Sequence, residues 1–151
     1  MEKEFVASLE DLLPLITEQL SQGYSVKFAP YGTSMRPMLR QGKDTVVFSP
    51  VSGKLKKYDL PLYRRDNGKF ILHRIVKVGE TYTCIGDNQF VAETGVRQDQ
   101  IIAVVSGFYR KGRYRSTEHF GYRFYCRVWH FSRPIRHLWR RGWGWLGRLF
   151  K

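Results

Sequence analysis

Three residue types that together make an activated hydroxyl nucleophile occur in order along the chain. Ser34 lies within YGTSMRPML, His73 lies within KFILHRIVKV, and the carboxylates of Asp87 and Glu93 follow within TCIGDNQFVAETG. A serine hydroxyl becomes a useful nucleophile when a base accepts its proton, and histidine suits that role near neutral pH. A carboxylate then fixes the tautomer of the imidazole and stabilises its charged form. The order of these residues predicts a serine hydrolase.

Each of these residues also has an ordinary structural interpretation. Serine is common in turns, and Asp and Asn bond to nearby backbone amides in loops such as Gly-Asp-Asn. Alternation along a strand would send Ile71, His73 and Ile75 to one face, where a histidine is often simply packed in the core. The hydrolase interpretation therefore depends on the combination of the three segments.

The three segments resemble, in this order, those of the type I signal peptidases and their relatives in the same serine-peptidase clan. The resemblance covers Gly32-x-Ser34-Met35-x-Pro37-x-Leu39, then LHRIV, then GDN, within about residues 24–108. It implies the family's compact, largely antiparallel β unit, with Ser34 as nucleophile. Bacterial members carry a lysine base, whereas the branch with a histidine in this segment implies His73 as the base.

The resemblance leaves the third catalytic residue open. The histidine branch has a catalytic Asp six residues after the Asp of its Gly-Asp-Asn segment, and this chain has Glu93 at that place. Glu is one methylene longer but can still orient an imidazole. Either Glu93 takes this role, or Asp87 takes it and also holds the loop.

The segment around Ser34 should form a tight corner that exposes the hydroxyl. We expect Gly32, Thr33, Met35 and Pro37 to shape this corner and to aim backbone N–H groups at the oxyanion that develops during acyl transfer. One such donor contributes about 3–4 kcal/mol to transition-state stabilisation. Some relatives carry a second donor hydroxyl two residues before the nucleophile, where this chain has Gly32, so Thr33 is the candidate.

We expect neither a metal ion nor a cofactor. Cys84 and Cys126 are too few, and too far apart in sequence, for a zinc site or a disulfide framework. Cys84 falls in an apolar run and is expected to be a small buried residue.

The elements that position these residues are a short helix and a series of strands. A helix is predicted after Ser8, with apolar residues at helical spacing and Gly23 at its end. Six strand-like segments follow, YSVKFAP, DTVVFSP, DLPLYRR, KFILHRIVKV, TYTCIGD and IIAVVSGFYR, and Asp66-Asn67-Gly68 predicts a hairpin. The predicted fold class is mainly β with α.

Charge divides the chain into a nearly neutral body and a basic tail. Residues 1–107 carry 14 Lys and Arg against 12 Asp and Glu, a net charge of +2, whereas residues 108–151 carry +11 of the total of +13. We therefore divide the chain into an N-terminal helix (1–23), a catalytic β domain (24–107) and a basic aromatic tail (108–151). The acidic N-terminus does not resemble a signal peptide, and no apolar run reaches the roughly 18–20 residues needed to span a bilayer.

The tail has the pattern of an amphipathic helix that lies in a membrane surface. From Pro134 onward, apolar residues recur at three- and four-residue spacing, with arginines largely on the opposite side. Trp and Arg in this pattern are typical of helices in the headgroup layer of anionic membranes. The expected membrane-facing residues are Trp129, Trp139, Trp143, Trp145, Arg136 and Arg140.

The sequence therefore predicts a peripheral membrane-associated serine endopeptidase of the signal-peptidase type. Its substrates would be preproteins or leader peptides, cut near small residues such as Ala. Without a spanning anchor it would work from the cytoplasmic face or with a membrane partner protein. The alternative is an inactive module that binds nucleic acid through the Arg- and Trp-rich tail. A self-cleaving repressor is disfavoured, because about 22 residues before the first strand cannot hold a helix-turn-helix.

Overall fold

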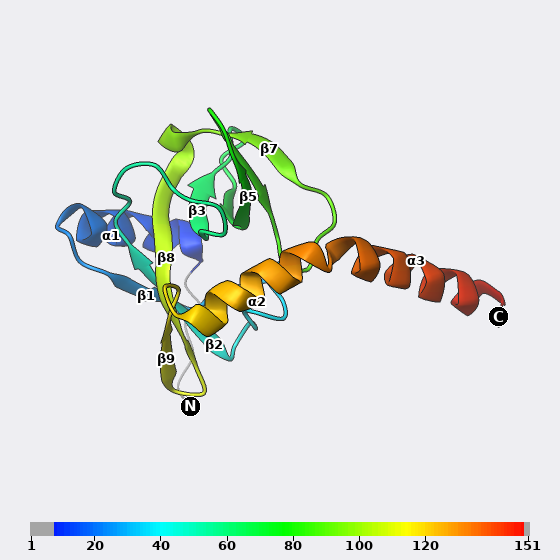
Figure 1. Cartoon of the computed structure of the whole chain (residues 1–151). Coiled ribbons are helices and arrows are strands. Elements are labelled where there is room, and N and C mark those ends of the chain that lie inside the picture. Colours follow the sequence, from blue (N-terminus) through cyan, green and yellow to red (C-terminus); the bar gives the residue numbers. More distant parts are fainter. Residues whose placement is uncertain (1–7, 150–151) are drawn as a thin grey trace.

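A computed structural model of the protein describes residues 8–149. Among these residues the fold contains three α-helices and two antiparallel sheets, which confirms the predicted combination of a β unit with a short N-terminal helix and a helical C-terminal segment (Figure 1). No helix among the described residues is both long and apolar enough to cross a membrane.

The larger sheet has six strands and forms the frame of the molecule. Five of them lie side by side in the order β1, β2, β8, β3 and β4, and β9 pairs with the far end of β8. Their bounds are β1 Val26–Phe28, β2 Asp44–Ser49, β8 Ile101–Arg110, β3 Pro61–Arg64, β4 Phe70–Leu72 and β9 Arg113–Ser116. The alternating burial along β2 shows that one face of this sheet is covered by the core and the other is partly open.

The smaller sheet consists of three strands in chain order. They are β5 Arg74–Val78, β6 Tyr82–Ile85 and β7 Glu93–Val96, and the short 3-10 helix η1 Gln98–Gln100 returns the chain to β8. A second apolar cluster, separate from that of the larger sheet, packs around Ile75, Cys84 and Tyr63. Cys84 is fully buried, as expected.

The first helix, α1 (Leu9–Ser21), forms where the sequence predicted it. Ser8 caps it by accepting a hydrogen bond from the backbone N–H of Asp11 at 3.2 Å, and Gly23 follows its end with a φ of 85°. The helix buries Ile16 and Leu20 against the larger sheet. This packing contact places the start of α1 beside the candidate site.

The structure differs from the sequence predictions at three places. The segment predicted as one strand through His73 is two strands, because β4 pairs with β3 while β5 pairs with β6 of the other sheet. Glu93 begins β7 and does not lie in a loop. The boundary between residues 107 and 108 falls inside β8, which continues to Arg110 before the turn into β9.

Two helices follow the sheets and differ in how they contact the body. α2 (Phe120–Phe131) lies across the β unit, whereas α3 (Arg133–Leu149) extends away from it, in orange and red in Figure 1. Cys126 of α2 is buried, and α3 buries none of its residues. The tail is therefore one docked helix followed by one exposed helix.

Candidate active site

Ser34 lies in the turn that joins β1 to β2. Met35, Met38 and Leu39 of this turn are buried in the main core, and Ser34 itself is half-buried. Gly32, at the start of the turn, has a φ of 103°, a backbone conformation that residues with a side chain rarely adopt. The buried methionines therefore anchor the turn that carries the half-buried serine.

The Gly86-Asp87-Asn88 segment holds this turn directly. The backbone N–H of Asn88 donates to the carbonyl oxygen of Ser34 at 2.8 Å, and the Asn88 side-chain amide donates to that of Thr33 at 3.2 Å. A Cβ on Gly86 would lie only 2.6 Å from the backbone carbonyl oxygen of Ser34, so the close contact between the two segments requires glycine. The Gly-Asp-Asn segment therefore holds the turn that carries Ser34 in place.

The opposite side of the turn is held from β8. Arg110 donates to the carbonyl oxygens of Pro37 and Met38. The N–H groups of Ser34 and Met35 have no acceptor within the described chain, and these are the groups that an oxyanion could use.

His73 is the single residue between β4 and β5, where the chain passes from one sheet to the other. Only 5% of its surface is exposed, and its Nδ1 atom is buried without a hydrogen-bond partner. Burial lowers the pKa of His73 to about 4, with a further contribution from the positive charge of Arg65. The imidazole is therefore neutral at physiological pH, the form in which a base accepts a proton.

Ser34 and His73 both line one cavity. It has a volume of about 960 Å³ and is lined by both residues and by the start of α1. Its apolar walls include Phe28, Leu39, Phe48, Leu62, Phe70 and Leu72. No hydrogen bond joins Ser34 to His73 in the described structure. Catalytic hydrogen bonds are often long before substrate binds, so the shared cavity is the relevant geometry.

Glu93 does not contact His73 by a hydrogen bond. Its carboxylate accepts a hydrogen bond from the hydroxyl of Tyr63 at 2.7 Å and forms an ion pair with Arg65 at 2.9 Å. The ring of Tyr63 in turn lies edge-on to the imidazole, with 6.5 Å between the ring centres. Glu93 therefore acts on His73 through space, and its charge raises the pKa of the histidine against the effect of burial.

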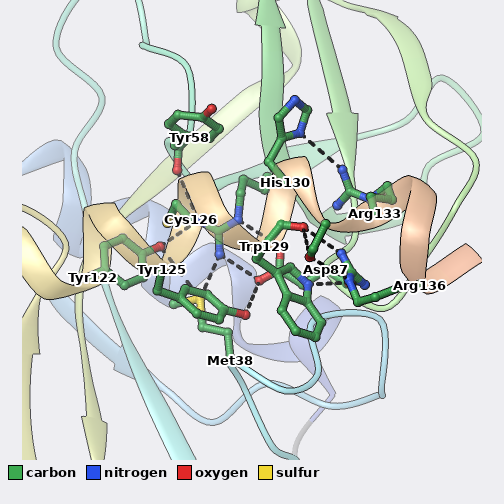
Figure 2. Close-up of polar contacts among 12 residues, drawn as sticks. Met38, Tyr58, Asp87, Tyr122, Tyr125, Cys126, Trp129, His130, Arg133 and Arg136 are labelled. Atoms are coloured by element: carbon green, nitrogen blue, oxygen red, sulfur yellow. Dashed lines mark hydrogen bonds and ion pairs between the residues drawn. The ribbon is translucent and has the colours of Figure 1, made fainter.

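Asp87 is engaged elsewhere, on the side of its loop that faces α2 (Figure 2). Its two carboxylate oxygens accept hydrogen bonds from Nε and Nη2 of Arg74, each at 2.8 Å. The hydroxyl of Tyr125 donates to the same carboxylate at 3.1 Å. Both partners of the Arg74–Asp87 pair are fully buried. Neither predicted carboxylate thus orients His73 directly, and Asp87 holds the loop that holds Ser34.

Helix α2 covers the buried Arg74–Asp87 ion pair, a contact that the sequence did not predict. Arg74 donates to Tyr122 Oη at 2.8 Å and to Cys126 Sγ at 2.9 Å, and the indole of Trp129 donates to the Asp87 carbonyl at 2.8 Å. A signal was present, because residues 122, 125, 126 and 129 recur at helical spacing on one side of the segment.

The tail residues predicted to face a membrane fall into two groups. Trp129 is half-buried against the body, and Arg136 stacks over its ring at 3.7 Å while donating to the carbonyl oxygens of Asp87 and Trp129. These two residues therefore belong to the body and not to the exposed face. The other four, Trp139, Trp143, Trp145 and Arg140, are exposed on α3.

Within residues 8–149, no three His, Cys, Asp or Glu side chains come close enough to hold a metal ion together.

A scan against models of known protein families finds no match for this chain. A search of the curated proteins likewise finds no relative.

Proposed function

We propose that the protein is a serine endopeptidase that acts on peptides at a membrane surface. The observation that carries the proposal is the cavity that Ser34 and His73 both line, where the buried imidazole is neutral and the serine lies in a turn anchored by buried methionines. Ser34 would attack the scissile carbonyl and His73 would accept its proton. The free N–H groups of Ser34 and Met35 would hold the oxyanion.

The substrate class follows from the walls of the cavity and from the resemblance of the motifs to signal peptidases. The largely apolar lining suits an extended peptide with hydrophobic side chains, such as the export segment of a preprotein or a leader peptide. Cleavage next to small residues is the family's preference and remains part of the proposal.

Membrane attachment is supported by the exposed apolar side chains of the tail. On α3 they form one stripe, with Ile135, Leu138, Trp139, Leu146 and Leu149 exposed between 45 and 74%. Phe120, Phe124 and Phe131 of α2 point away from the body and are also exposed. A monomer that exposes so many large apolar side chains in one region usually binds a partner or a membrane there, and the surrounding arginines favour anionic lipid.

The test compares the intact protein with Ser34→Ala and His73→Ala variants on a peptide library in the presence of liposomes. Products are identified by mass spectrometry. We expect both variants to remain folded and to lose at least about a thousandfold in turnover, as is usual when a nucleophile or its base is removed. Near-normal turnover by either variant would show that the residue does not have the proposed role.

A further inference from the structure

A second cavity lies where α2 meets α3, beside the loop that carries Phe90. It has a volume of about 420 Å³ and is lined by Phe90, His130, Phe131, Arg133, Pro134 and His137. None of these residues lines the cavity of Ser34 and His73. We propose that this cavity binds a phosphate-type oxyanion, supplied by a lipid headgroup or by a soluble phosphate ester.

The first argument is an excess of positive charge on its walls. Arg133 has its Nε atom buried without a hydrogen-bond partner, and its Nη1 atom lies 3.4 Å from Nδ1 of His130. Burial, followed by the neighbouring charge of Arg136, lowers the pKa of Arg133. A guanidinium in this state would gain charge-assisted hydrogen bonds from an anion.

No carboxylate supplies the missing negative charge. Asp87 is the acid that acts on Arg133, but its oxygens are already bound by Arg74 and Tyr125. Glu118 is the sole acidic residue from Phe108 onward and lies at the other end of α2. The cavity therefore offers the guanidinium of Arg133, whose Nε atom has no hydrogen-bond partner among residues 8–149.

The second argument is the shape of the aromatic wall. His137 stacks on Phe90, with 4.8 Å between the ring centres and 18° between the planes, while Arg136 and Arg140 lie 6.0 and 5.6 Å from the same ring. This packing fixes His137 at the edge of the cavity. Two imidazoles and a guanidinium therefore line one cavity, and their N–H groups are donors that suit a small anion.

The position of the cavity fits a lipid headgroup. Phe131 lines the cavity and also belongs to the exposed apolar face of α2, and Ile135, also exposed, follows Pro134 on α3. A phosphate bound here would leave its acyl chains next to those apolar side chains. The lipid source rests on the membrane attachment proposed above, whereas binding of a soluble phosphate ester does not.

The first experiment titrates the full chain with glycerol 3-phosphate and follows the histidine ring signals by NMR. We expect saturable shifts at His130 and His137 and none at His119, which lies at the start of α2. The Arg133→Gln variant should weaken binding at least about tenfold, because one charge-assisted contact is lost. The matched control Arg141→Gln removes the same charge from an exposed site on α3 and should change binding less than about twofold. Absence of saturable shifts, or equal weakening by the two variants, would overturn the site.

The second experiment measures flotation of the same variants on vesicles of phosphatidylcholine with and without phosphatidic acid. A larger loss for Arg133→Gln than for Arg141→Gln supports the site and identifies the lipid as the source. Equal losses on vesicles, combined with selective loss of glycerol 3-phosphate binding, support the site with a soluble source. If the intact protein floats on neither vesicle, membrane attachment fails, and the soluble titration alone decides whether the site exists.

Discussion

At the scale of residues, the protonation of His73 controls whether the proposed chemistry can start. Burial holds the pKa of His73 at about 4, well below its usual value of 6.5. We therefore expect peptide hydrolysis to stay nearly constant between about pH 7.5 and pH 5 and to fall only toward pH 4. The measurement is kcat/KM against pH on a soluble peptide, and an inflection near pH 6.5 would contradict a buried, neutral base.

The same shift predicts how acid affects stability. Because the unfolded chain binds a proton at His73 near pH 6.5 and the folded chain only near pH 4, the free energy of unfolding should decrease as the pH falls through this window. His73→Gln removes the titrating group, so its stability should depend less on pH over the same range. Denaturant titrations at pH 7 and pH 4.5 compare the two proteins.

Asp87 and Glu93 should respond differently to loss of charge. Asp87→Asn leaves the buried guanidinium of Arg74 without its counterion, which should lower the free energy of unfolding by about 3–5 kcal/mol and disturb the Ser34 turn. Glu93→Gln breaks an ion pair with Arg65 whose partners are each about a third exposed, and should cost about 1 kcal/mol. Denaturant unfolding and peptide turnover would be measured on both variants. A smaller loss of stability for Asp87→Asn would show that the ion pair does not hold the fold.

Ser34 and His73 could be selected as candidates from the sequence because their residue types and order limit the chemistry to a few choices. In the structure both residues line the same cavity. The third residue was not predictable, because the partners of a carboxylate depend on tertiary contacts. Asp87 turns toward Arg74 and α2, and Glu93 toward Tyr63 and Arg65, and no local pattern specifies these directions.

At the scale of elements, most of the strands were predictable from apolar runs, whereas the short polar strands were not. β7 and β9 contain few apolar residues, and β7 buries only Val96, so their pairing is determined by neighbouring strands. The split of the predicted strand at His73 likewise depends on which sheet each half joins. Tertiary context decides such cases over local preference.

α2 belongs to the folded body, although its sequence resembles that of the exposed helix after it. A chain that ends at His137 keeps Arg136 and retains the contacts of Tyr122, Tyr125, Cys126 and Trp129 around the Arg74–Asp87 pair. We expect this chain to unfold at nearly the same denaturant concentration as the full chain. A chain that ends at Glu118 exposes the ion pair and should lose about 3–5 kcal/mol or fail to fold. Equal unfolding midpoints for the two shortened chains would show that α2 contributes little.

At the scale of the whole molecule, the docked α2 and exposed α3 provide a way to hold the cavity of Ser34 and His73 near lipid. α2 contacts the loop that holds Ser34 on its inner face and exposes phenylalanines on its outer face. α3 continues from it with apolar side chains on one side and Arg140, Arg141 and Arg148 largely on the other. A surface bound through these helices would keep the site at a fixed height above the membrane.

The corresponding prediction concerns flotation on vesicles that contain anionic lipid. Leu138→Gln combined with Trp139→Gln removes two exposed apolar side chains and should weaken vesicle binding at least about a hundredfold, because each contributes about 1.5–3 kcal/mol when buried. The control Gly147→Gln adds a neutral polar side chain on the arginine side of α3, where the structure leaves open space, and should bind normally. Both proteins should cleave a soluble peptide at the unaltered rate, since neither change touches the cavity of Ser34 and His73.

Vesicle binding that survives the double substitution would argue against an apolar contact with lipid. Preferential binding of the intact protein to nucleic acid in a competition would instead favour the nucleic-acid module.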